Sequence, residues 1–244
     1  MYMIDFLTRA IKHPIDYFGI VRFQKIELLR IESFNGNIYS FVFKKPQHLT
    51  WKAGQHSVFW FFGEKMQGGI WRAFSIASSS EENEVRIATI ISDTPSDFKK
   101  KLKSLNPGDH IYMQGPFGEF HAGNKKQIVG IAGGIGITPF RALAYDITHG
   151  HCGDTKLSLI YSATHQLHTF KDELEQWKTA SNNLELTYTE TPDEVNDSLD
   201  KKIEQYNNDA YYFISGSPGM ISALKKSCKT KGVTKVVNDP FKGY

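Results

Sequence analysis

The segment GGIGITPF, residues 133–140, carries the clearest chemical signal in the sequence. Its glycines let the backbone turn tightly and approach a ligand closely. The helix pattern that follows would offer free amide groups and the positive end of its dipole to a phosphate. Pro139 stands at the last position of a G-x-G-x-x-G fingerprint, so the match to the dinucleotide-binding pattern is incomplete. A nucleotide site and a tight structural turn both account for these glycines.

Two further turns follow apolar strand patterns in the second half of the chain. One is ISGSPGM, residues 214–220, and the other is YSATH, residues 161–165, which includes Ser162. Ligands of open parallel sheets bind outside the carboxyl ends of the strands. We therefore expect the three strand ends to hold one elongated nucleotide together.

A fourth unusual segment is WRAFSIASSS, residues 71–80, in the first half of the chain. The alternation of a strand puts Arg72 and Phe74 on one face and Ser75 on the other. A core strand would carry aliphatic residues at these positions, and a surface strand has no need of this mixture. Taken alone, the segment shows only that Arg72 and Phe74 share a face, and its role depends on what the other half of the chain binds.

The elements that must position these segments differ between the two halves of the chain. From about residue 21 to about residue 120, short alternating strands are separated by turns, and Asn35-Gly36 gives a strong hairpin signal. One helix pattern, residues 96–105, interrupts them. Strands of this kind predict a small antiparallel β-barrel.

From residue 127 onward, apolar strands alternate with helices, which predicts βαβ units around a parallel sheet. We therefore predict a two-domain chain, with an N-terminal antiparallel β-barrel over residues 21–123 and a C-terminal α/β domain over residues 124–244. Residues 1–20 form a helical extension, in which Ile4, Leu7 and Ile11 have helical spacing. We expect this helix to pack on the domain, with membrane contact as the alternative.

Composition excludes several other classes of protein. The 244 residues carry a formal net charge of +3, which is too small to indicate a nucleic-acid partner. No apolar run is long enough to span a bilayer, and we expect no signal peptide. The two cysteines, Cys152 and Cys228, cannot hold an iron–sulfur cluster and fit a reducing, cytoplasmic location.

Other polar and aromatic groups have ordinary explanations. The histidine pairs at residues 149 and 151 and at residues 165 and 168 lack accompanying carboxylates or thiolates, so we expect no metal site. The lysines at residues 99–101 and 103 are expected to be a solvated helix face, with docking of an acidic redox partner as the alternative. Four aromatic residues in strand patterns are expected in the core, namely Trp51, Phe59, Trp60 and Phe62.

The order of the segments RAFS, GPFGEF, GGIGITPF and SGSPGM, followed by a C-terminal aromatic residue, resembles the ferredoxin–NADP reductase superfamily. The resemblance covers nearly the whole chain after about residue 20. It implies a barrel that binds FAD and an α/β domain that binds NADH or NADPH.

The resemblance also implies roles for residues of the barrel. The family's R-x-[YF]-[ST] motif falls on Arg72, Phe74 and Ser75. Arg72 would pair with the flavin pyrophosphate, because a guanidinium fork suits phosphate oxygens. Phe74 would pack on the isoalloxazine or ribityl region, and Ser75 would hydrogen-bond near N5, which receives the hydride. Ser96, at the start of the barrel helix, would bind phosphate with the amides of that helix.

In the second domain, the resemblance assigns two ligand-binding segments. The pyridine-nucleotide pyrophosphate turn corresponds to Gly133, Gly134, Gly136 and Thr138, and the stretch beside the nicotinamide to Gly216, Pro218 and Met220. Ser215 stands where the family usually has cysteine, and it would orient the stacked rings together with Ser75. The terminal DPFKGY resembles members whose last residues fold over the flavin. Phe241 or Tyr244 would then cover the ring, and Asp239 would lie near Ser75.

Two departures from the family pattern affect ligand binding. Ile91 stands where many relatives have a basic residue near the flavin phosphates, so modest flavin affinity is expected. Thr164 stands where NADP-preferring relatives often have arginine, which favours NADH. His165 or Lys171 could supply the missing cation, so both nucleotides stay open.

We therefore expect an FAD-dependent NAD(P)H oxidoreductase that passes hydride to flavin and then electrons to a separate carrier. The carrier would be ferredoxin, flavodoxin or a partner oxygenase, because the chain cannot hold a cluster of its own. The enzyme itself is expected to be a monomer. Two alternatives stay open: a flavin reductase that uses free flavin, and a flavin- or nucleotide-binding regulatory subunit without turnover.

Overall fold

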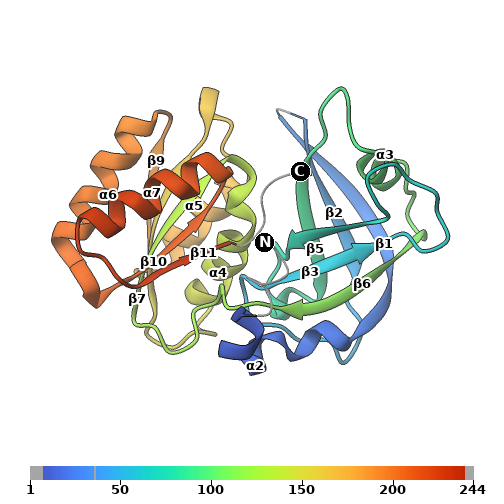
Figure 1. The fold of residues 1–244 in the computed structure, drawn as a ribbon, viewed down its shortest axis with the longest axis horizontal. Helices are drawn as coiled ribbons and strands as arrows, with labels where there is room; N and C mark the ends of the chain where they lie inside the picture. The colour runs from blue at the N-terminus through green and yellow to red at the C-terminus, as the bar shows by residue number, and fades with distance from the viewer. Residues whose placement is uncertain (1–7, 36, 240–244) are drawn as a thin grey trace.

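Two sheets lie side by side in the computed structural model, which describes residues 8–35 and 37–239 (Figure 1). The first sheet has six antiparallel strands in the order β4-β3-β6-β1-β2-β5. Their bounds are β1 (Phe23–Phe34), β2 (Ile38–Lys44), β3 (His56–Trp60), β4 (Trp71–Ser75), β5 (Glu84–Ile90) and β6 (His110–Phe117). The helix α3 (Asp97–Lys103) lies between β5 and β6 in the chain.

The first sheet curls so that its two edge strands meet beyond the end of β4. There the amide of Ala77 donates to the carbonyl of Arg86, at 2.7 Å. Apolar side chains from the inner face, including Phe41, Phe43 and Phe59, form the core of the barrel. The seam between β4 and β5 is the side that faces the second domain.

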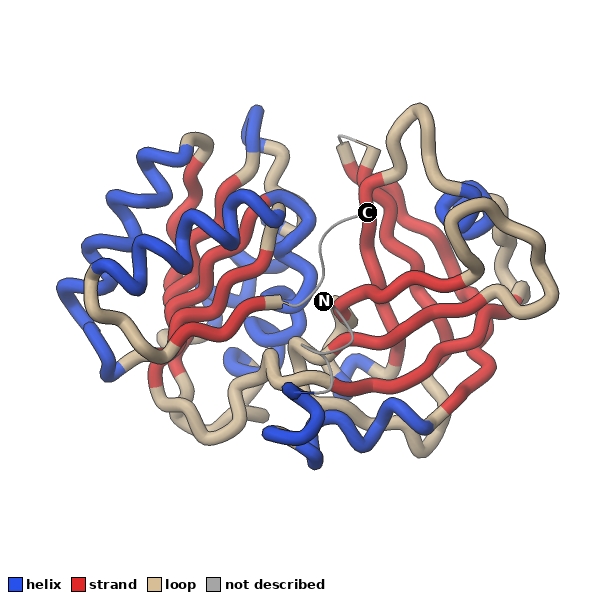
Figure 2. Tube along the Cα trace, in the orientation of Figure 1, coloured by secondary structure: helices blue, strands red, loops and turns tan. Residues whose placement is uncertain are grey.

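The second sheet has five parallel strands in the order β11-β10-β7-β8-β9. They are β7 (Gln127–Gly133), β8 (Lys156–Ser162), β9 (Leu184–Thr189), β10 (Tyr211–Ser215) and β11 (Val236–Asn238). The helices are α4 (Thr138–Thr148), α5 (Lys171–Ala180), α6 (Pro192–Tyr206) and α7 (Pro218–Thr230). The apolar strands are buried because helices cover both faces, α4 and α5 on one and α6 and α7 on the other (Figure 2). The predicted two-domain fold class is confirmed.

A buried arginine of α4 joins the two domains. The side chain of Arg141 is only 3% exposed, and its two terminal nitrogens bond both carboxylate oxygens of Glu82 in the barrel, at 2.8 and 3.0 Å. It also donates to the carbonyl of Ala77 at 2.8 Å and pairs with Glu173 of α5 at 2.5 Å. Because α4 begins at the glycine-rich turn, this helix fixes that turn relative to the barrel.

The N-terminal segment is held against the barrel by polar groups and by the buried ring of Tyr17, 6.0 Å from that of Phe117. Residues 8–12 are helical and are followed by α2 (Pro14–Tyr17) and the 3₁₀ turn η1 (Phe18–Val21), which run along the barrel beside β6 (Figure 1). Arg9 pairs with Glu119 at 2.7 Å, and Asp16 pairs with Lys52 at 2.7 Å. In the described part of the chain, no helix is both long and apolar enough to cross a membrane.

Two expectations about apolar residues are wrong. Ile11 is exposed rather than packed on the domain, because polar residues of its helix make the contacts with the barrel; Ile4 and Leu7 lie outside the described residues. Phe62 is also exposed, and Trp60 is only half-buried, because both lie on the outer side of the barrel. Trp51 and Phe59 are buried as predicted.

Replacing Arg141 by leucine should lower the free energy of unfolding by about 3 kcal/mol, because it leaves the Glu82 carboxylate without its buried partner. The urea midpoint, followed by tryptophan fluorescence, measures the change. Lys178→Leu is the matched control, since it breaks an exposed pair with Glu175 that contributes at most about 1 kcal/mol. Equal midpoints for the two variants would contradict this role of Arg141.

Candidate active site

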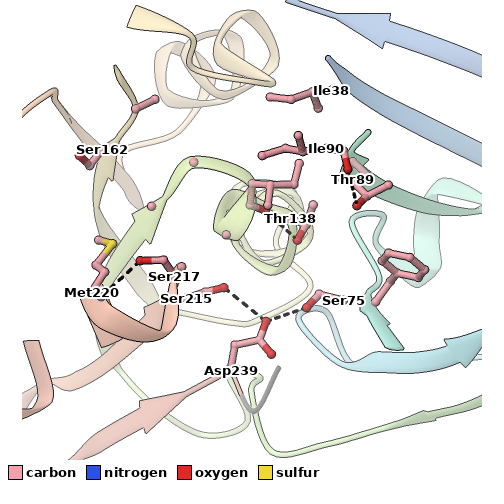
Figure 3. A pocket seen from close by; sticks show the side chains of 18 of the residues that line it. Ile38, Ser75, Thr89, Ile90, Thr138, Ser162, Ser215, Ser217, Met220 and Asp239 are labelled. Carbon is pink, nitrogen blue, oxygen red and sulfur yellow. Dashed lines mark hydrogen bonds between the residues drawn. The ribbon is translucent and has the colours of Figure 1, made fainter. Parts of the chain in front are cut away.

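A cavity of about 620 Å³ lies between the two domains. On the barrel side it is lined by β4 and β5 at their seam and by α3. On the other side it is lined by the carboxyl ends of β7, β8 and β10 and by the turns that follow them. The three strand ends that the sequence singled out therefore open into the same space as the segment 72–75 (Figure 3).

Two cations line the barrel end of the cavity. Arg72 of β4 donates through Nη1 to the carbonyls of Gly68 and Trp71, at 3.0 and 2.7 Å, and its guanidinium lies 5.6 Å from the centre of the Phe98 ring. Lys99 of α3 donates to the carbonyl of Ile90 at 2.9 Å. Burial lowers the pKa of the Lys99 ammonium, and the charge of Arg72 lowers this pKa further. A ligand that brings negative charge to this end would relieve the repulsion between the two cations.

The glycine-rich turn on the opposite wall packs closely on the turn after β10. A Cβ at Gly136 would lie 2.4 Å from the carbonyl oxygen of Ser215, so only glycine allows this approach. Gly134 has a φ of +53° and open space where a side chain would be. The first amides of α4 lie directly after this turn, where they would suit a phosphate.

A carboxylate joins two serines of different domains in the centre of the site. Ser75 donates to Oδ2 of Asp239 at 2.7 Å, and Ser215 donates to the same oxygen at 3.3 Å (Figure 3). Asp239 follows β11, and its amide donates to the carbonyl of Ile214 at 3.0 Å. The backbone of the α/β domain thus holds this carboxylate against the barrel serine.

The remaining walls of the cavity are largely apolar. Ile38, Ala88 and Ile90 line it from the barrel, and Leu167 and Met220 from the α/β domain. A flat ring system suits the space between them, with phosphates at the cationic end and at the glycine-rich turn. The residues present therefore fit a flavin dinucleotide on the barrel side and a pyridine nucleotide on the other.

The structure brings most of the predicted site residues to this one cavity. Those that line it are Arg72, Phe74, Ser75, Gly133, Gly134, Gly136, Thr138, Ser162, Ser215, Gly216, Pro218, Met220 and Asp239. Their individual roles stay predictions. Phe241 and Tyr244 lie outside the described residues.

Two predicted positions lie elsewhere. Ser96 precedes α3 and does not line the cavity; its hydroxyl makes no capping bond to that helix. Ile91 is buried in the barrel core, and the neighbouring Ile90 faces the cavity instead.

Lys99 is the functional candidate that sequence reasoning missed. It is half-buried and lines the cavity, so the expectation of a fully solvated lysine face is wrong for this residue. The sequence did contain a signal for this position. Phe98 and Leu102 are four residues apart, so they share one face of the helix, and both are buried; Lys99 follows Phe98 directly. A lysine next to such an apolar stripe lies at the edge of the buried face.

Family models match both domains of the chain. The model described as "Oxidoreductase FAD-binding domain" covers residues 25–122, and "Oxidoreductase NAD-binding domain" covers residues 131–226. The chain is an FAD-dependent NAD(P)H oxidoreductase of the ferredoxin–NADP reductase-like family. The barrel of this reductase is thus its FAD-binding domain, and the α/β domain binds the pyridine nucleotide.

Individual relatives agree with this assignment. The reductase is 29% identical to NADH-cytochrome b5 reductase 1 of Scheffersomyces stipitis, over 90% of its own chain and 84% of the relative. It is 27% identical to one component of the Na⁺-translocating NADH-quinone reductase of Actinobacillus pleuropneumoniae, over 85% of its own chain. In that second comparison it spans only 56% of the relative's length.

Solved structures share the fold. The ferredoxin–NADP⁺ reductase of Neisseria gonorrhoeae with bound FAD and NADP matches with a TM-score of 0.72 and 20% identity, over 91% of this chain and 99% of that one. The cytochrome b5 reductase domain of Ulva prolifera nitrate reductase matches with a TM-score of 0.72 and 19% identity. That match covers 90% of this chain and 98% of the other.

Replacing Lys99 by alanine should raise the dissociation constant for FAD about tenfold to hundredfold, because a hydrogen bond to a charged group contributes about 1.5–3 kcal/mol. Flavin fluorescence titration of the flavin-free protein measures the change. Lys100→Ala is the control, since Lys100 is exposed on the same helix and pairs with Asp97. The assignment fails if both variants bind FAD as tightly as the parent protein.

Proposed function

We propose that this reductase takes hydride from NADH and delivers electrons one at a time to a separate carrier protein. The observation that supports NADH is the position of the positively charged side chains in the cavity. The cations among the described residues that line the cavity, Arg72 and Lys99, both belong to the barrel. A 2′-phosphate on the nucleotide would therefore find no cation on the wall formed by the α/β domain.

The residues that could replace the missing cation do not alter this inference. Thr164 lines the cavity, whereas Lys171 and His165 are not among its lining residues. The ammonium of Lys171 instead lies 5.0 Å from the centre of the Tyr188 ring. Both relatives compared above, the cytochrome b5 reductase and the quinone reductase component, are named for NADH.

Bound flavin supplies the chemistry that converts a two-electron hydride donor into two one-electron transfers. The protein positions the two ligands relative to each other. Asp239 holds the hydroxyls of Ser75 and Ser215 on opposite sides of one carboxylate oxygen, so the two ligand-binding domains are aligned at the point where the rings would meet. Apolar side chains such as Ile90 and Met220 line the space around them.

The electrons must then leave the chain. Two cysteines cannot hold an iron–sulfur cluster, so we infer a separate acceptor such as ferredoxin or flavodoxin. The relative's name adds cytochrome b5 as a candidate of the same one-electron class. The pair of cations at the flavin end favours a retained FAD over the alternative of a released flavin substrate.

Anaerobic reduction of the FAD-loaded protein tests the choice of nucleotide. The second-order rate constant for flavin bleaching should be at least about tenfold larger with NADH than with NADPH, since a 2′-phosphate left without its cation loses a charged contact. Equal rates, or a preference for NADPH, would refute the donor assignment. A panel of ferredoxin, flavodoxin, cytochrome b5 and free flavin then identifies the acceptor class.

Replacing Asp239 by asparagine should slow flavin reduction about tenfold to hundredfold, because the acceptor that holds both serines loses its charge. Stopped-flow bleaching at saturating NADH measures the rate, and FAD affinity should stay unchanged. Asn238→Ala is the control, since Asn238 lies in β11 but does not line the cavity. If the flavin of the Asp239→Asn variant is reduced at the parent rate, the role assigned to this carboxylate is refuted.

A further inference from the structure

The N-terminal segment turns its apolar side away from the barrel. Ile11 lies in the helical residues 8–12, Ile15 lies in α2, and Phe18 and Val21 lie in η1, with a break in the helix at His13. These four side chains are 79%, 84%, 65% and 70% exposed, respectively. The contacts with the barrel are made instead by the buried Tyr17, whose ring lies 6.0 Å from that of Phe117, and by charged residues such as Arg9, which pairs with Glu119. The four exposed apolar side chains take no part in these contacts and are available to another partner.

The outer face of the barrel continues this pattern. Cross-strand pairing places Trp71 opposite Trp60, Trp60 opposite Tyr112, and Tyr112 opposite Lys25, in one row over β4, β3, β6 and β1. Phe62 stacks on Trp60 with ring centres 5.4 Å apart and an angle of 15°. The solvent face of an antiparallel sheet is ordinarily polar, so a row of aromatic residues there is unusual.

Contacts of Gln114 and Phe23 join the end of the N-terminal segment to the aromatic row. Gln114 of β6 donates to the carbonyl of Ile20 at 2.7 Å and accepts a bond from Trp60 Nε1 at 3.1 Å, so it joins η1 to the aromatic row. Phe23, the first residue of β1, lies 6.1 Å from Phe62 and 6.3 Å from Trp60 between ring centres. We call this surface the apolar face; its most exposed members are Ile11, Ile15, Phe18, Val21, Phe23, Phe62 and Trp71.

Positive charge surrounds the apolar face. Lys12, Arg22 and Lys25 are exposed, and none of them forms an ion pair with a carboxylate of the described residues. Arg22 lies 5.7 Å from the centre of the Phe18 ring. Among the nearby carboxylates, Asp16 pairs with Lys52, and Glu64, two residues from Phe62, pairs with Lys101. Glu27, on the outer side of β1, forms no ion pair within the described residues, so three cations stand against one such carboxylate.

We propose that the apolar face docks this reductase peripherally on the surface of an anionic lipid bilayer. Aromatic rings that are apolar in body and polar at one edge are typical of the membrane interface, and basic residues add attraction to anionic headgroups. The outer side of a barrel sheet is convex, which suits a soft planar surface. A second copy fits less well, because a two-fold contact would bring the basic residues of both copies, two each of Arg22 and Lys25, into one interface.

The proposed docking leaves the active site open. Trp71 and Arg72 are successive residues of β4 and point to opposite faces of the sheet, Trp71 outward and Arg72 to the cavity. Farther along the strand, Ala73 and Ser75 lie on the side of Trp71 and do line the cavity, so only the start of β4 belongs to the apolar face. A reductase held in this way could still meet NADH and a carrier protein from the solvent.

Flotation with vesicles tests the proposal on the whole chain with FAD bound. The probes are vesicles of phosphatidylcholine alone and of phosphatidylcholine with about 30% phosphatidylserine, a composition of the order that anionic leaflets reach. We expect flotation with the anionic vesicles, suppression by high salt, and a blue shift of tryptophan emission on binding. A protein that stays with the soluble fraction in low salt would overturn the proposal.

Variants separate the apolar and charged contributions. The double variant Ile15→Ser, Phe18→Ser and the double variant Arg22→Glu, Lys25→Glu should each lower the bound fraction at least about tenfold at fixed lipid. Lys201→Glu combined with Lys226→Glu is the charge-matched control on the α/β domain and should bind as the parent does. Unchanged flavin content and NADH bleaching show that each variant is folded.

Other occupants would give different results. Sedimentation that reveals a concentration-dependent dimer, lost in the Ile15→Ser, Phe18→Ser variant and accompanied by no flotation, assigns the face to a second copy. A face that binds an acidic carrier protein but no vesicle assigns it to that protein. Either result would overturn lipid docking while leaving the oxidoreductase assignment intact.

Discussion

The buried pair of Arg141 with Glu82 sets the relation between the two domains. The cavity has half of its wall in each domain, so its shape depends on their mutual orientation. One helix, α4, begins at the glycine-rich turn and carries Arg141 within its first turns. Because a buried guanidinium without its carboxylate is costly, the helix cannot shift away from the barrel without a large loss of stability. Ligand geometry and domain docking are thus determined by the same element.

The charged groups that line the cavity are distributed unequally between the two domains. The barrel contributes two cations to the cavity, Arg72 and Lys99, whereas the α/β wall offers backbone amides at the glycine-rich turn. Fixed charge suits a cofactor that stays bound, since strong contacts slow its release. Neutral donors suit a nucleotide that must arrive and depart in each cycle. Between them, Asp239 supplies a single acceptor for a serine from each side.

Periodicity was sufficient to predict the fold, because each half of the chain has a consistent pattern. The apolar run of residues 127–133 coincides with β7, and the motif residues around Ser75 and Gly134 meet at the cavity because strand ends fix them. Lys99 was missed because a helix in isolation does not reveal which neighbouring strand covers its flank. The exposure of Phe62 was missed for a related reason, since alternation identifies two faces but not which one is inside.

The row of aromatic residues on β3 and β4 has a practical consequence for optical measurements. The chain has four tryptophans, and they occupy different environments: Trp51 in the barrel core, Trp60 and Trp71 on its outer side, and Trp177 beside Arg141. Indole emission overlaps the near-ultraviolet absorption of oxidised flavin, so energy transfer makes Trp71, adjacent to Arg72, a built-in donor for the cofactor. Trp177 lies at the domain junction and reports on its integrity. The molecule therefore carries separate intrinsic fluorophores for cofactor loading and for interdomain contact, and single-tryptophan versions would resolve the two signals without added dyes.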